Sequence, residues 1–189
     1  MKALTIEQGS QARFVDIPEP VCGKGEVLIN VERVGLCGSD LNTWRGLNPL
    51  VNYPCIPGHE IGGTVLATGD MAGAIKPGDR VVVLPCTECG VCSSCLSGRP
   101  NACKNNQTLG VQRQGGMAQQ LTMPAHKVIV CNALSVDELA LVEPLAVGLH
   151  ADAPRDKCTL SCAINGIHAA FHYLKKNYIS GCVMTVPTG

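Results

Sequence analysis

The sequence lacks a net charge, because its fifteen lysines and arginines are balanced by fifteen aspartates and glutamates. Such a balance gives no net positive charge that would steer the chain toward nucleic acid or an anionic membrane surface. A long apolar run that would span a bilayer is also missing, as is an apolar stretch of the signal-peptide type near the N-terminus. We therefore expect a cytoplasmic protein with no nucleic-acid partner and no membrane association.

The composition is that of a globular protein. The chain has 189 residues, of which 46% are apolar and 16% charged, enough for one domain or for one domain and a fragment. Its twelve cysteines would indicate disulfides in a secreted chain. In a reducing compartment, and grouped as they are here, they indicate metal binding instead.

Short alternating segments separated by turns predict a mainly β fold. The expected strands are 1–8, 13–17, 26–34, 61–68 and 80–84, with two more between 115 and 130 that are broken at Pro124. Many short strands at close spacing favour a small barrel or sandwich over a parallel sheet.

Three places in the first 151 residues favour short helices. Residues 36–45 follow a cysteine and form the first candidate, which Gly38 weakens. Ser135 with Glu138 three residues later has the form of a capping box, so a helix should begin there. Pro144 suits the first turn of a further helix, which places Glu143 at a joint between two helical pieces.

The segment from Gly35 to Glu60 carries ligands for one open zinc site. Cys37 and His59 each stand among glycines, which let the backbone bend or approach closely. Catalytic zinc is held by three ligands drawn from Cys, His, Asp and Glu, with a fourth position left open. Taken singly, each residue is more often a buried thiol or an ordinary loop histidine.

A second constellation consists of four cysteines in a turn-rich stretch, namely Cys89, Cys92, Cys95 and Cys103. Four thiolates suit a closed, tetrahedral structural zinc site. Cys86 extends the three-residue spacing backward and is an alternative ligand.

These motifs together resemble the zinc-containing medium-chain alcohol dehydrogenases. The resemblance rests on Gly-Leu-Cys-Gly-Ser-Asp at 35–40, Gly-His-Glu at 58–60, the four cysteines, and Glu-Pro-Leu-Ala-Val-Gly-Leu-His-Ala at 143–151. The last stretch looks most like the sorbitol, threonine and sugar-acid branch. The resemblance implies a GroES-like β-barrel catalytic domain over residues 1–151 with a zinc lobe at about 86–107. It also implies a following Rossmann half that binds NAD(H) or NADP(H).

Residues 152–189 do not resemble that continuation, and no Gly-x-Gly-x-x-Gly occurs anywhere in the chain. We expect an anomalous C-terminal tail, with a helix candidate at 167–178, on a truncated or rearranged member of the family. The oligomeric state is open, although a barrel face once covered by the missing half would favour a homo-oligomer.

The expected reaction is oxidation of a secondary alcohol, such as a polyol, sugar acid or amino alcohol, to a ketone. Cys37 and His59 would bind the catalytic zinc, and Glu60 and Glu143 compete for the third ligand position. On a regular strand His59 and Glu60 would point apart, so both can bind only if the backbone bends.

Two further residues receive roles in this hypothesis. Asp40 would orient His59, with a capping or solvated aspartate as the alternative. Ser39 would relay the substrate proton, with an N-cap role as the alternative, while Asn42 stands where many relatives carry a histidine.

The expectation is thus two zinc ions per chain and a small alcohol or polyol substrate. The alternatives are an inactive remnant of the family and a non-enzymatic zinc module that mediates interactions.

Overall fold

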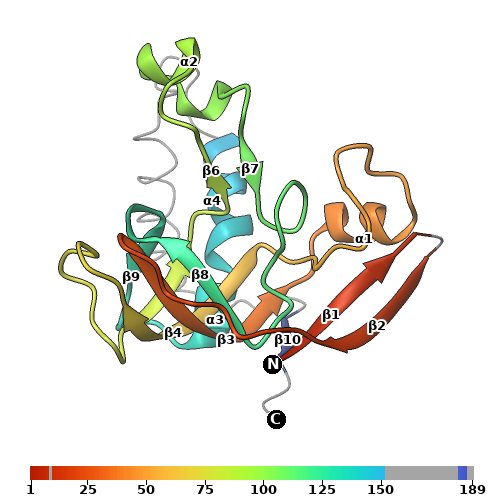
Figure 1. Ribbon diagram of the computed structural model, residues 1–189, viewed down its shortest axis with the longest axis horizontal. Coiled ribbons are helices and arrows are strands. Elements are labelled where there is room, and N and C mark those ends of the chain that lie inside the picture. Colours follow the sequence, from red (N-terminus) through yellow and green to blue (C-terminus); the bar gives the residue numbers. More distant parts are fainter. Residues whose placement is uncertain (9, 152–182, 187–189) are drawn as a thin grey trace.

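A computed structural model describes residues 1–8, 10–151 and 183–186, and these residues form a mainly β fold with short helices, as the sequence predicts (Figure 1). The strands are β1 (Lys2–Glu7), β2 (Gln11–Asp16), β3 (Glu26–Gly35), β4 (Glu60–Thr68), β5 (Arg80–Val83), β6 (Cys86–Thr87), β7 (Gln107–Thr108), β8 (Gln120–Pro124), β9 (Val128–Val130) and β10 (Val183–Thr185). Strands β1 and β2 form a hairpin, β6 and β7 a second pair, and the others one sheet. The predicted strands and the break after Pro124 are confirmed to within a few residues.

Strand β3 organises the large sheet. It pairs antiparallel with β4 from Val27 to Gly35, while its other edge pairs with β8 and then with β10. Val27, Ile29 and Val31 alternate along β3 and are almost completely buried. This period-two pattern is the one expected for a strand that presents one side to the core. Because β3 ends at Gly35 and β4 begins at Glu60, the two segments that carry the zinc motif meet at one end of the sheet.

The helices follow the predicted signals. Helix α1 (Gly38–Trp44) directly follows β3, and α3 (Val136–Ala140) begins at Ser135. The Ser135 hydroxyl accepts a hydrogen bond from the Glu138 N–H at 3.3 Å, and the Glu138 carboxylate accepts one from the Ser135 N–H at 2.8 Å. After a break at Leu141, α4 (Val142–Ala151) carries Glu143 in its first turn. The predicted capping box and the joint before Glu143 are therefore both confirmed.

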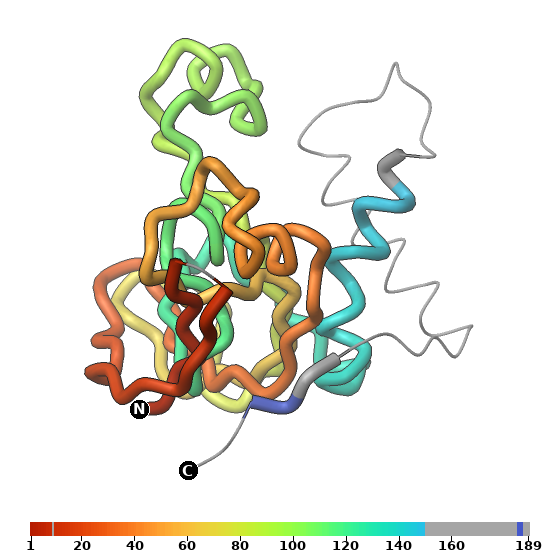
Figure 2. Tube along the Cα trace, turned by 90° about the vertical axis from the view of Figure 1, so that its right-hand side faces the viewer, coloured from red at the N-terminus to blue at the C-terminus, as the bar shows by residue number. Residues whose placement is uncertain are grey.

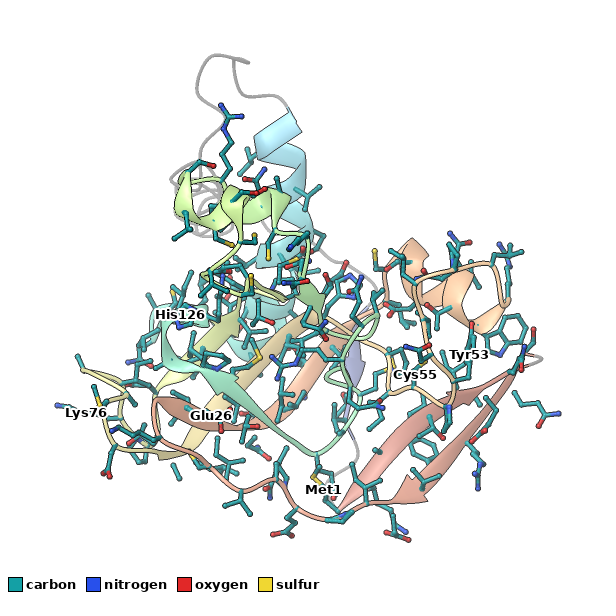
Figure 3. All side chains as sticks on the ribbon, turned by 45° about the horizontal axis from the view of Figure 1, so that its top comes forward. Met1, Glu26, Tyr53, Cys55, Lys76 and His126 are labelled. Carbon is teal, nitrogen blue, oxygen red and sulfur yellow. The ribbon has the colours of Figure 1, made fainter. Side chains whose placement is uncertain are left out.

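The four-cysteine lobe projects from the sheet on a narrow neck (Figures 1 and 2), and it also stands away from the sheet in the view that shows the side chains (Figure 3). Strands β6 and β7 pair antiparallel to form this neck, and the lobe beyond it contains α2 (Ser93–Leu96) and the 3-10 turn η1 (Pro100–Ala102). Lys127, in the 3-10 turn η2 (Ala125–Lys127) before β9, is buried and forms an ion pair with Glu88 at the base of the lobe. Neither the neck nor this ion pair was predicted from the sequence.

Part of the predicted C-terminal tail joins the sheet, since β10 pairs antiparallel with the end of β3. Val183 stands opposite Gly35 in this pairing. The helix expected at 167–178 lies outside the described residues. Within the described part of the chain, none of the helices combines the length and the apolar character needed to cross a membrane.

Candidate metal centres

The structure brings three of the predicted zinc ligands together. One ligand atom each from Cys37, His59 and Glu60 lies within 4.8 Å of the others. Cys37 is the N-cap of α1, His59 precedes β4, and Glu60 is the first residue of β4. The antiparallel register places Glu60 opposite Gly35, two residues before Cys37. Segments more than twenty residues apart in the sequence thus meet because β3 and β4 are neighbours.

The backbone bend that would let His59 and Glu60 face one point is present. Gly58 has φ +94°, in the left-handed region that favours glycine, and His59 lies outside the regular strand. A Cβ at Gly58 would stand 2.8 Å from Cγ1 of Val34, so a side chain there is also excluded by space.

Asp40 acts on the backbone of both ligand segments. Its Oδ2 accepts a hydrogen bond from the Cys37 N–H at 3.0 Å, and its Oδ1 accepts one from the Gly58 N–H at 3.0 Å. The carboxylate is only 5% exposed, which excludes a solvated aspartate, whereas its bond from the Cys37 N–H makes Asp40 part of the α1 capping box, so the alternative capping role is confirmed. Nδ1 of His59 lies 3.8 Å from Oδ1 of Asp40, so the predicted orienting contact is longer than a hydrogen bond. Among the described residues, this Nδ1 is the buried side-chain nitrogen that has no hydrogen-bond partner.

The two competing carboxylates occupy different positions. Glu60 belongs to the close group, whereas Glu143 comes from the first turn of α4 and stands outside it. Burial raises the pKa of the Glu60 carboxyl, the negative charge of Asp40 raises it further, and a hydrogen bond with Cys37 opposes the shift. Burial also raises the pKa of Glu143 to about 7, to which the charge of Glu60 contributes. The two carboxylates are therefore close enough for their charges to interact.

Ser39 is the second residue of α1 and is partly exposed. The N-cap of this helix is Cys37, so the alternative N-cap role for Ser39 is wrong. The helix begins two residues earlier than that alternative required.

The second group brings together the sulfur atoms of Cys89, Cys92, Cys95 and Cys103, all within 4.8 Å of one another. Cys103 Sγ lies 3.5 Å from Cys89 Sγ and 3.8 Å from Cys92 Sγ. Cys86, the alternative ligand, is exposed on β6 and stands outside the group, with its sulfur 3.4 Å from the Thr108 hydroxyl.

The lobe stabilises thiolates through its backbone. N–H groups of Val91 and Cys92 lower the pKa of the Cys89 thiol to about 6. Those of Cys95 and Lys104 lower the pKa of Cys92. Burial and the neighbouring sulfurs raise the pKa of Cys95 to about 12. Four adjacent thiols cannot all ionise without a compensating cation, so this arrangement suits a metal ion better than four independent thiols.

The chemistry of both donor sets fits zinc. A thiol, an imidazole and a carboxylate match an open zinc site with a free fourth position, and four thiols match a closed one. At the first group, a cation would also offset the mutual repulsion of the buried acids Asp40 and Glu60. No other group of three or more His, Cys, Asp or Glu residues with this spacing occurs in the part of the chain that the structure describes.

Comparison with known protein families identifies the family to which the chain belongs. A family model described as the alcohol dehydrogenase GroES-like domain matches residues 23–133. The chain belongs to this family. The resemblance drawn from the zinc motifs is therefore confirmed, and so is the GroES-like fold.

Individual relatives agree with this assignment. A zinc-type alcohol dehydrogenase-like protein of Haemophilus influenzae is 42% identical over 153 residues, which cover 80% of this chain and 45% of the relative. Sorbitol dehydrogenase of Bacillus subtilis is 39% identical over 158 residues, covering 81% and 45%. A crystal structure of an alcohol dehydrogenase from Escherichia coli CFT073, complexed with NADH, superimposes with a TM-score of 0.72 at 32% identity, covering 80% of this chain and 45% of that one. The chain thus spans about half the length of the relatives it matches.

Proposed function

We propose that this chain carries the zinc-binding catalytic half of an alcohol or polyol dehydrogenase. The reaction is oxidation of a secondary alcohol, such as a polyol, sugar acid or amino alcohol, to a ketone with transfer of a hydride to NAD or NADP. The observation that carries the proposal is the convergence of Cys37, His59 and Glu60 within 4.8 Å. Three ligands of these types leave one position of a tetrahedral ion for substrate.

In this proposal Cys37, His59 and Glu60 hold the catalytic zinc, and Glu143 is the nearby carboxylate that competes with Glu60. Zinc, when bound, supplies a Lewis acid that lowers the pKa of an alcohol hydroxyl. The imidazole would use Nε2 for the metal, because Nδ1 faces Asp40 at 3.8 Å. Asp40 acts as a positioning residue, since it fixes the backbone of both ligand segments through the N–H groups of Cys37 and Gly58.

The proton and the hydride leave the substrate by different routes. Ser39, partly exposed on α1 and two residues after Cys37, takes the hydroxyl proton and passes it toward solvent. Asn42 follows on the same helix, but its side chain cannot titrate. Water therefore receives the proton directly from Ser39. A nicotinamide, when bound, would supply the acceptor for the hydride on the alcohol carbon, which would thereby become a carbonyl carbon.

The second zinc ion belongs to the four-cysteine lobe and has a structural role. The four sulfurs leave no open position for a substrate. The nine cysteines of the described residues are all free, which supports a reducing, cytoplasmic location.

Polyols form the substrate class that we propose to test first, because sorbitol dehydrogenase is among the relatives. The assay follows NADH or NADPH formation from sorbitol, threonine and a sugar acid, using the chain itself and a fusion of residues 1–151 to the nucleotide-binding half of the Bacillus subtilis enzyme. We expect turnover by the fusion and its loss in the His59→Ala variant. A folded, zinc-loaded fusion that oxidises no secondary alcohol would show that the proposal is wrong.

A further inference from the structure

We propose that Gly35 is a positioning residue for the open metal centre. The absence of a side chain at this point gives the Glu60 carboxylate its place beside the Cys37 thiol. This inference rests on the proposed function, because it concerns how one ligand of that centre is held.

The space above Gly35 is filled by Glu60. A Cβ built on Gly35 would lie 2.0 Å from Oε2, 2.9 Å from Cβ and 3.1 Å from Cδ of Glu60. The two residues stand directly opposite each other in the β3–β4 pairing. The Glu60 carboxylate therefore lies over Gly35, its neighbour on β3. A methyl group on residue 35 would collide with both the Cβ and the carboxylate of Glu60.

Backbone conformation does not account for this glycine. Unlike Gly58, whose φ is +94°, Gly35 is not among the residues with positive φ. An L-residue could adopt its extended backbone without strain. Space for Glu60 is therefore the physical requirement that glycine meets at this position.

A displaced Glu60 carboxylate has no equivalent place to go. The residue is only 6% exposed, so rotation into solvent is blocked, and the negative charge of Asp40 disfavours the side where that residue lies. Beside Cys37 the carboxylate does have a place, since one of its oxygens lies within 4.8 Å of the Cys37 sulfur. A methyl group at residue 35 would push the carboxylate away from this thiol and reduce the close ligand set to Cys37 and His59.

The test is a double-mutant cycle on metal binding. Gly35→Ala, Glu60→Ala and the double variant are titrated with Co²⁺ after the four-cysteine lobe has been loaded with zinc, and both the affinity and the ligand-field absorption are recorded. We expect Gly35→Ala to weaken Co²⁺ binding by roughly tenfold to a hundredfold, the usual loss when a ligand is no longer held in place. Its spectrum should match that of Glu60→Ala, and the double variant should bind no more weakly than Glu60→Ala alone.

Gly38→Ala is the matched control, because it lies on the other side of Cys37 and a Cβ there meets nothing within 4 Å. It should bind Co²⁺ as the unmodified chain does. If Gly35→Ala fails to fold alone but folds in the Glu60→Ala background, the same coupling is demonstrated. The inference would be overturned if Gly35→Ala bound Co²⁺ as the unmodified chain does. It would also be overturned if Gly35→Ala weakened Co²⁺ binding just as much in the Glu60→Ala background, or if it misfolded in both backgrounds. Failure of the unmodified chain to bind Co²⁺ would instead contradict the proposed function.

Discussion

Asp40 and Gly58 are eighteen residues apart, yet Oδ1 of Asp40 accepts a hydrogen bond from the Gly58 N–H at 3.0 Å. The other oxygen of the same carboxylate holds the Cys37 N–H. One buried acid thus ties the segment that presents the thiol to the segment that presents the imidazole. The distance between Cys37 and His59, two of the proposed ligands, thus depends on a residue outside the proposed ligand set.

Replacement of this acid by its amide should loosen both segments. Asn in place of Asp40 has one acceptor oxygen, so one of the two N–H groups would face an NH₂ group and lose its partner. We expect Asp40→Asn to lower the unfolding free energy of the zinc-loaded protein by about 2 kcal/mol, the scale of a buried hydrogen bond to a charged group. Urea unfolding measures this, with Ser39→Ala on the same helix as the control. An Asp40→Asn variant as stable as Ser39→Ala would contradict this role.

The order of the lobe should depend on metal. Structural zinc contributes on the order of 10 kcal/mol to folding of its site, and Cys103 is a buried member of the four-sulfur group. We expect Cys103→Ser to lose one zinc ion and to expose residues 86–107 to protease. Cys86→Ser should keep the metal and resist cleavage, because Cys86 is exposed and outside the group. Equal cleavage of the two variants would refute the assigned ligand set.

Gly62 should be as intolerant of a side chain as Gly35, but for a different reason. A Cβ at Gly62 would lie 2.2 Å from the backbone oxygen of Val136, so α3 would have to move off β4. We expect Gly62→Ala to cost about 2 kcal/mol of stability, a typical penalty for overpacking. The control is Gly148→Ala on α4, where a Cβ meets nothing within 4 Å. Thermal unfolding compares the two, and equal midpoints would show that α3 does not pack as described.

Metal-free protein should lose stability as the pH rises, through Glu143. Its pKa is raised to about 7 in the fold, from an ordinary value of 4.5, so the folded state keeps a proton that the unfolded state has lost. The stabilising contribution of Glu143 to the unfolding free energy is fully present below about pH 4.5 and is lost as the pH rises through about 7. We expect the Glu143→Gln variant to gain stability relative to the unmodified protein between pH 5 and pH 8, by roughly 2 kcal/mol.

Urea unfolding of both proteins in the presence of a chelator measures this difference, and comparison of the two cancels contributions from the lobe thiols. Parallel pH dependence in the two proteins would contradict the shifted pKa of Glu143. Since the charge of Glu60 contributes to the raised pKa of Glu143, saturating zinc should reduce the difference.

The sequence predicted those features that depend on local chemistry. The β strands follow from period-two alternation, the start of α3 from Ser135 and Glu138, and the two clusters of candidate ligands from the spacing and type of their residues. The capping box was predictable because both of its hydrogen bonds lie within four residues.

Features that depend on strand register could not be predicted in this way. Gly35 stands opposite Glu60 only because β3 and β4 pair in one particular register, which no local pattern specifies. The buried contact of Lys127 with Glu88 likewise joins residues that are far apart in sequence. The choice between Glu60 and Glu143 remained open for the same reason, since α4 and β4 are brought together only by the fold.

Zinc content is the measurement that tests the central claim most directly. We predict two zinc ions per chain in the unmodified protein, one in His59→Ala, and one in Cys103→Ser, as determined by elemental analysis of protein whose folding is verified by circular dichroism. Two ions retained by a folded His59→Ala variant, or a single ion in the unmodified chain, would contradict the claim that Cys37, His59 and Glu60 form an open metal centre.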